Sequence, residues 1–252
     1  MKTVDYDVIT LSYYETWLGQ SGCISNPEAI HFIYTNERNI QQQGYPSCID
    51  LYVWLQPNKI IVSYGDKARL KIEELNKILT TKHDVLDVSK ILSSLYGSDI
   101  KHNLKYLFTS ANLNNKIEAK TLTATDYDDY EKFFLGCFPN NKIEWLREYF
   151  EEMIEYGYCV GVYEDNALVS CTDAPSMPYM TNKVQEIGIN TLPDYRGKGY
   201  AAVSCIKAAE NIIASGKVPQ WSTTIGNTAS QKLAERAGFI KLSDVLTVTL
   251  LN

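Results

Sequence analysis

Histidine is scarce in this sequence of 252 residues, and long apolar runs are missing. The three histidines are His31, His83 and His102, so the second half of the chain holds none. A histidine-based catalytic triad or a His/Cys metal cluster within that half is therefore excluded. No apolar stretch approaches the roughly 20 residues of a membrane span, and the acids in MKTVDYDVIT do not fit a secretory signal. We expect a cytoplasmic protein with no membrane partner and no metal.

The six cysteines form no CxxC pair and lie in segments that resemble ordinary strands and helices. We therefore expect reduced structural thiols rather than a disulfide framework or a metal site. Cys171 and Cys205 have no histidine in their half of the chain to activate them as acyl carriers, so we expect both to be structural.

The charge is uneven along the chain. The formal net charge is −6, residues 1–117 carry twelve acids and twelve bases, and the whole acidic excess follows residue 117. An acidic surface of this kind disfavours nucleic acid as a partner.

The most informative stretch runs from Val184 to Ala202. Apolar residues alternate with polar ones up to Leu192, the pattern of a strand, and Pro193 and Asp194 end it. Apolar residues then recur at spacings of three and four, which predicts an amphipathic helix that begins inside the RGKG segment and stops at Gly216.

The predicted start of this helix is an anion site. The first turn of a helix has backbone N–H groups without internal partners and carries the positive end of the macrodipole. Gly197 and Gly199 let a ligand approach the backbone, and Arg196 and Lys198 add positive charge. We expect the backbone of residues 198–201, which includes Tyr200 and Ala201, to donate most of the contacts to a phosphate or pyrophosphate.

Two families with phosphate-binding turns do not fit. A P-loop needs a Ser or Thr directly after GK, and here Gly199 follows Lys198. A dinucleotide fingerprint is formally present in residues 197–202, but the ribose-binding acid expected about 20 residues later is absent between Lys217 and Gly226.

A third pattern fits better. Arg196, Gly199 and Ala201 match R-x-x-G-x-A after a strand and a Pro-acid-Tyr turn, and Asn227 opens a segment Asn-x-x-Ser-x-x-Leu-Ala-x-x-x-Gly-Phe. Together these two motifs resemble the GCN5-related N-acetyltransferases (GNAT) over residues 118–252.

The resemblance implies an α+β fold with a central mixed sheet flanked by helices. The strand-like and helical runs before it predict a second, smaller α/β domain, which the resemblance does not cover. We place the domains at 1–116, with no role assigned, and at 117–252, the catalytic domain. In the second domain we expect a strand at residues 117–126 and two closing strands, at residues 239–242 and 245–251. The co-substrate would be acetyl-CoA, held at the turn, by the strand carbonyls of Ile189 and Thr191, and by Asn227. The residue pattern makes Asn227 a helix cap first and a coenzyme contact second.

Two interpretations of Glu186, the acid of the central strand, stay open: a solvated strand position, or the general base that removes a proton from an incoming ammonium. Family members often use a tyrosine of the last helix as general acid, and Ala234 stands at that place. The predicted function is N-acetylation of a primary amine. The alternative is an acyl-CoA-binding or regulatory module without catalysis.

The acceptor would be a small-molecule or peptide amine. Nine acids crowd the two helices that border the acceptor side in the resembled fold, which favours a cationic amine. The same acids also fit two solvated helix surfaces. They are Asp126, Asp128, Asp129, Glu131, Glu144, Glu148, Glu151, Glu152 and Glu155. The sequence does not indicate an oligomeric state.

Overall fold

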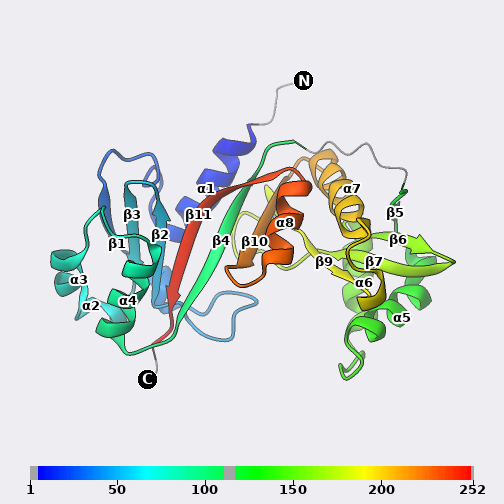
Figure 1. Ribbon diagram of the computed structural model, residues 1–252, viewed down its shortest axis with the longest axis horizontal. Coiled ribbons are helices and arrows are strands. Elements are labelled where there is room, and N and C mark those ends of the chain that lie inside the picture. The colour runs from blue at the N-terminus through cyan, green and yellow to red at the C-terminus, as the bar shows by residue number, and fades with distance from the viewer. Residues whose placement is uncertain (1–4, 111–116, 251–252) are drawn as a thin grey trace.

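Two β-sheets with helices on both faces make up the described chain, residues 5–110 and 117–250 of a computed structural model (Figure 1). The larger sheet has the strand order β1-β3-β2-β11-β4-β10-β8, and the smaller has the order β5-β6-β7-β9. Both parallel and antiparallel pairs occur in the larger sheet. The fold is therefore the mixed α+β architecture expected from the sequence.

The first part of the chain supplies four strands and most of one end of the molecule. Its elements are α1 (Tyr6–Leu18), β1 (Ile30–Tyr34), the 3-10 helix η1 (Asn36–Asn39), β2 (Leu51–Gln56), β3 (Lys59–Tyr64), α2 (Asp66–Arg69), α3 (Ile72–Ile78), α4 (Val85–Tyr96) and β4 (Ile100–Phe108).

The second part supplies the smaller sheet and completes the larger one. Its elements are β5 (Lys120–Thr121), η2 (Ala124–Asp126), α5 (Tyr127–Cys137), α6 (Leu146–Glu155), β6 (Val160–Glu164), β7 (Ala167–Asp173), β8 (Val184–Glu186), β9 (Gly188–Thr191), η3 (Pro193–Tyr195), α7 (Tyr200–Ala214), β10 (Val218–Thr224), α8 (Thr228–Arg236) and β11 (Phe239–Val248).

The larger sheet draws strands from both parts. β4 pairs antiparallel with β10 on one side and with β11 on the other, and β11 also pairs with β2. The predicted domain boundary at residues 116/117 borders residues 111–116, which lie outside the described residues. The division into two domains stays a prediction, and any such division has to cross this shared sheet.

The two sheets meet and part at one residue, Ile187. β8 pairs in parallel with β10, and β9, which follows directly, pairs antiparallel with β7. Between them the N–H of Ile187 still donates to the carbonyl of Gln220 on β10 at 3.1 Å. Beyond this bond the strand leaves one sheet for the other, so β9 and β10 diverge and leave a wedge between the sheets.

Helices cover the sheets on two sides, as alternation along the strands requires. One side of the larger sheet packs under α1, and the other under α2 to α4 and α8. The long helix α7 lies on the α8 side, against both sheets, while α5 and α6 cover the opposite side of the smaller sheet. We call the α7 and α8 side the motif side and the α1, α5 and α6 side the opposite side.

Three details differ from the sequence predictions. The segment 117–126, expected as a strand, forms only the two residues of β5 and then turns into η2. The two expected closing strands form one strand, β11, whose register shift between Lys241 and Ser243 absorbs the polar interruption. The helix after the glycines begins at Tyr200, with Gly199 as its N-cap, at the end of the RGKG segment rather than within it.

All six cysteines are free thiols. Within residues 5–110 and 117–250, no helix combines the length and the apolar character needed to cross a membrane, and no three His, Cys, Asp or Glu side chains converge to hold a metal ion.

Candidate functional site

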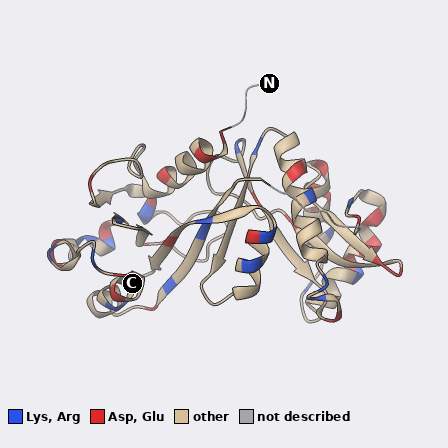
Figure 2. Cartoon of the chain, turned by 45° about the horizontal axis from the view of Figure 1, so that its top comes forward, with Lys and Arg blue, Asp and Glu red and all other residues tan. Residues whose placement is uncertain are grey.

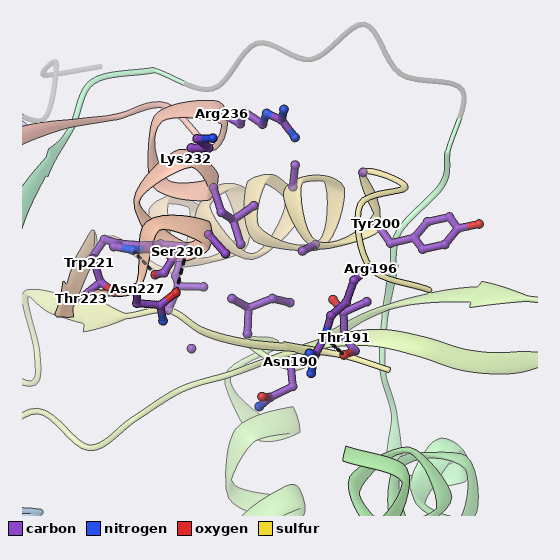
Figure 3. Close-up of a pocket in the computed structure, with 18 of the residues that line it drawn as sticks. Asn190, Thr191, Arg196, Tyr200, Trp221, Thr223, Asn227, Ser230, Lys232 and Arg236 are labelled. Atoms are coloured by element: carbon purple, nitrogen blue, oxygen red, sulfur yellow. Dashed lines mark hydrogen bonds between the residues drawn. The ribbon is translucent and has the colours of Figure 1, made fainter. Parts of the chain in front are cut away.

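The wedge between β9 and β10 contains a cavity of about 600 Å³ (Figure 3). Its walls come from β8 and β9, the glycine turn, the start of α7, β10 and α8. The residues that line it include Glu186, Gly188, Ile189, Asn190, Thr191, Tyr195, Arg196, Gly197, Gly199, Tyr200, Ala201, Trp221, Ser222, Thr223, Asn227, Ser230, Lys232, Leu233 and Arg236. Nine of the ten residues predicted from the sequence are among them, and the tenth, Lys198, is not.

The cavity opens toward both sides of the larger sheet. Trp221 packs in the core under α7 and α8, whereas the hydroxyl of Ser222, the next residue, bonds to Glu186. Successive residues of a strand point to opposite faces. Because both residues line the cavity, two molecules could enter the wedge from different sides and meet within it.

The turn before α7 presents a row of free backbone donors. Gly197 and Gly199 have φ values of 78° and 92°, in the left-handed region that favours glycine. Within the described residues, none of the five N–H groups from Gly197 to Ala201 donates to a protein acceptor. The next two, of Ala202 and Val203, donate to the carbonyl of Gly199. Five unpartnered donors at a helix N-terminus form an anion-binding nest.

Basic side chains surround the same end of the cavity. Arg196 Nε donates to the carbonyl of Thr191 at 3.2 Å, which fixes the guanidinium beside the strand edge. Lys198 Nζ lies 4.7 Å from the centre of the Tyr195 ring. Across the opening, α8 adds Lys232 and Arg236, one turn apart (Figure 3). Anionic groups that enter here meet positive charge from two elements.

The edge of β9 that faces away from β7 borders the cavity, and no described strand pairs with it. Leu192 N–H bonds to Val169 on the β7 side, and Ile187 N–H bonds to Gln220 on the other. The direction of backbone groups alternates along a strand. The backbone groups of Ile189 and Thr191 therefore point to the cavity edge, as the predicted pairing with an extended ligand requires.

Asn227 caps α8, as the sequence indicates. Its Oδ1 accepts a hydrogen bond from Ser230 N–H at 3.1 Å. The side-chain Nδ2 keeps its two donors, and Figure 3 shows the amide at the edge of the cavity. One side chain can thus serve both roles considered for it.

Glu186 lies at the other end of the cavity. Its Oε1 accepts a hydrogen bond from the Ser222 hydroxyl at 2.5 Å. The charge of Glu186 acts on nearby residues. Burial is the main cause that raises the pKa of Tyr45 to about 12, and the negative charge of Glu186 is the second. Burial lowers the pKa of the Lys105 ammonium, and the negative charge of Glu186 acts in the opposite direction. Glu186 is thus half-buried among polar groups rather than fully solvated.

The position at which family members often have a tyrosine, Ala234, is buried in this structure. Ala234 is 0% exposed and packs in the core between α7 and α8. Among the described residues, the tyrosines that line the cavity are Tyr195 and Tyr200, both near the turn. Figure 3 shows the Tyr200 ring pointing away from the cavity.

Sequence reasoning missed Ser222, Lys232 and Arg236. The two bases could have been found, because they stand four residues apart on α8 and on the opposite face from the buried Ala234. Ser222 had no sequence signal of its own. Its role depends on the pairing of β10 with β8 beside Glu186.

Comparison with known proteins agrees with this geometry. Residues 59–244 match the sequence model of the family described as GNAT acetyltransferase. No curated protein matches the sequence. Among solved structures, the chain is similar to an acetyltransferase of the GNAT family from Colwellia psychrerythraea, with 17% identity, a TM-score of 0.52 and coverage of 64% of this chain and 62% of that one.

A GCN5-related N-acetyltransferase from Sphaerobacter thermophilus gives a TM-score of 0.50 at 12% identity, over 66% of this chain and 58% of that one. The chain therefore spans about three fifths of the length of these two relatives, and at such identities the likeness concerns the fold. The family match covers well over half of the sequence. The chain belongs to the GNAT acetyltransferase family.

Proposed function

We propose that this protein transfers the acetyl group of acetyl-CoA directly to a primary amine. The observation that supports this most strongly is the row of five unpartnered N–H groups, residues 197–201, beside a cavity of about 600 Å³. A pyrophosphate offers several anionic oxygens to such a row. The cavity volume is in the range usual for small-molecule and cofactor sites.

We call this cavity, between β9 and β10, the coenzyme cavity. Its remaining features suit the rest of the coenzyme. Lys232 and Arg236 would meet the phosphate on the ribose, because they form the second basic patch on the cavity. The amide groups of the pantetheine arm would pair with this edge of β9 at Ile189 and at Thr191, whose carbonyl also accepts a hydrogen bond from Arg196. The thioester would then lie deep in the wedge, toward Glu186 and Ser222.

The reaction forms a bond between the amine nitrogen and the acetyl carbonyl carbon and breaks the C–S bond of the thioester. An ammonium acceptor has to lose one proton before it can attack, and we assign that proton to Glu186, directly or through water. The nitrogen loses a second proton during transfer, and the departing thiolate takes up one proton. The net products are the N-acetyl amine, the free thiol of CoA and one proton. Much of the rate gain would come from holding the two reactants together.

Six free thiols agree with a reducing compartment, and we propose the cytoplasm as the site of action.

The turn can be tested with two matched variants. Gly197 and Gly97 both have positive φ, at 78° and 61°, and a Cβ added at either meets nothing within 4 Å. Gly197→Asp and Gly97→Asp therefore cause comparable backbone strain, but only the first places a carboxylate at the row of donors.

Acetyl-CoA at about 100 times its Kd should stabilise the parent and Gly97→Asp by about 2.7 kcal/mol, measured by thermal unfolding. Gly197→Asp should lose most of this effect, and Gly197→Asn, which is uncharged, should keep more of it. If Gly197→Asp is stabilised as strongly as the parent, the turn is not the phosphate site.

A further inference from the structure

A second cavity, of about 360 Å³, lies on the other side of β9, under α5 and α6. We call it the aromatic cavity, because rings from α5, α6 and the segment between them form most of its wall. These are Tyr130, Phe133, Phe134, Phe138, Trp145 and Tyr149. Trp145 is 46% exposed, so the cavity is reachable from solvent.

One carboxylate belongs to the polar floor of this cavity. Asp173 ends β7 and pairs with Gly188 of β9. A Cβ built on Gly188 would lie 1.6 Å from Asp173 Oδ1, so the carboxylate occupies the space that a side chain at 188 would need. Glycine at this position thus lets the acid lie flat over the strand.

The side chain of Asp173 is half-buried and makes no ion pair with any described residue. Its Oδ1 is buried and has no hydrogen bond. Two other acids of the sheets differ in this respect: Asp126 lies 2.6 Å from Lys120, and Asp244 contacts His102 and Lys241. An unpaired buried carboxylate is costly, because desolvation is not offset by a nearby cation.

The surroundings suit an organic cation. Ring faces attract ammonium groups, and the attraction increases when the cation leaves water. Burial, and to a smaller degree the charge of Glu186, raise the pKa of Asp173 to about 6, so the group is ionised at neutral pH and would gain from a positive partner.

The aromatic cavity adjoins the coenzyme cavity. Asn190 lines both of them, and Gly188, on which Asp173 rests, lines the coenzyme cavity. Ile187 and Ile189 pack in the core under α7, on the motif side. Glu186, Gly188 and Asn190 alternate with them along the chain and therefore face the opposite side. A molecule in the aromatic cavity would therefore approach the thioester from the opposite side, where α5 and α6 lie.

We propose that the acceptor is a small diamine or polyamine, with one ammonium held in the aromatic cavity against Asp173 while a second amine reaches the thioester beside Glu186. This rests on the proposed transfer function and adds the substrate class. The cation at Asp173 does not react, and it positions the amine that does.

The test uses 1,4-diaminobutane and the matched monoamine 1-aminobutane. Binding of each to the full chain is measured by calorimetry with saturating CoA, which carries no acetyl group, so turnover plays no part. Asp173→Asn keeps the size of the side chain and removes its charge. Glu73→Gln removes an exposed acid of α3 and serves as the control.

The diamine should bind the parent and Glu73→Gln at least ten times more tightly than the monoamine, and Asp173→Asn should lose most of that preference. The ratio of kcat/KM for the two amines should change in the same way. Equal binding of both amines to the parent, or an unchanged preference in Asp173→Asn, would overturn the proposal.

The outcomes also separate this inference from the proposed function. If acetyl-CoA binds and monoamines and diamines are acetylated equally well, the transferase proposal stands and the diamine proposal fails. If acetyl-CoA does not bind and no amine is acetylated, the transferase proposal itself fails.

Discussion

The two cavities on either side of β9 are lined by different kinds of chemical group. The coenzyme cavity is lined by backbone donors of the turn and by basic side chains such as Arg196 and Arg236. The aromatic cavity is lined by rings and by the unpaired Asp173. One side thus suits phosphate anions, and the other suits an organic cation. The polarity of each wall is the basis on which we propose the charge of its ligand.

The surface charges follow the same division less strictly. Figure 2 shows acidic residues gathered on the helices at the end of the molecule that holds α5 and α6. Some of them are paired, as Asp129 is with Lys132 and Glu151 with Arg147, and these pairs are largely exposed. Exposed ion pairs contribute little to the stability of a protein. We therefore assign recognition of the cation to Asp173, whose Oδ1 is buried, and only steering to the surface acids.

The largest effect should come from Glu186, which lines the coenzyme cavity beside Ser222. Glu186→Gln keeps the hydrogen bond to Ser222 available but removes the basic carboxylate. Turnover should fall by about 10²–10⁴-fold, with little change in the affinity for acetyl-CoA. Steady-state rates and calorimetry check the two halves of this prediction. An unchanged turnover across the pH range would make Glu186 a structural residue.

The next effect concerns the stability of the fold. The pKa of Asp173 is raised from 3.8 to about 6, so the folded state binds more protons than the unfolded state between these values. The sign follows: this group destabilises the fold as pH rises from about 4 to 6, by up to about 3 kcal/mol above that window. Asp173→Asn should therefore be more stable than the parent at pH 7 and not at pH 4.

The groups that face Asp173 do not interfere in that window. Tyr130 of α5, Tyr149 of α6, Cys171 of β7 and Cys205 of α7 have raised pKa values, chiefly through burial, and stay neutral. Glu186 contributes a like charge. Chemical unfolding of Asp173→Asn and Glu186→Gln at several pH values separates the two acids. Equal stability of Asp173→Asn and the parent at pH 7 would contradict the assignment of a buried, unpaired charge.

A smaller effect is expected at the far end of the coenzyme cavity. Lys232→Gln and Arg236→Gln should each weaken CoA binding by about tenfold at low salt, because each removes a charge from the second basic patch. Binding of dephospho-CoA, which lacks the ribose phosphate, should hardly change. Lys207→Gln on α7, where the lysine pairs with Glu210, is the control. Equal losses for both ligands would move the ribose phosphate elsewhere.

The smallest effect should follow from Ser222→Ala. The hydroxyl donates to Glu186 and so helps to hold its carboxylate in place. Without it, turnover should fall by only a few-fold, because the carboxylate itself remains. A turnover equal to that of the parent would show that this hydrogen bond has no part in the reaction.

The sequence predicts one cavity far better than the other. The glycine turn, the cap at Asn227 and the strand before them are local patterns, and each is visible within about ten residues of sequence. Asp173 becomes notable only through its register with Gly188, and the rings around it come together only when α5 and α6 pack on β7. Sites made by register and packing leave no short motif.

Long-range pairing also explains why the place of the first half of the chain in the fold could not be predicted from the sequence. Residues 100–108 look like one more strand in the sequence, but β4 becomes the centre of the larger sheet because β10 and β11 pair on both of its edges. Long-range pairing of this kind is decided by the whole fold and not by local propensity.

The most direct test of the central claim is a stoichiometric transfer assay with acetyl-CoA and 1,4-diaminobutane. Free thiol is followed by a colorimetric reagent, and the N-acetyl amine by mass spectrometry in the same samples. We predict one N-acetyl amine for each thiol released, activity lost in Gly197→Asp and activity retained in Gly97→Asp. Thiol release that is independent of the amine, or full transfer by Gly197→Asp, would contradict the account.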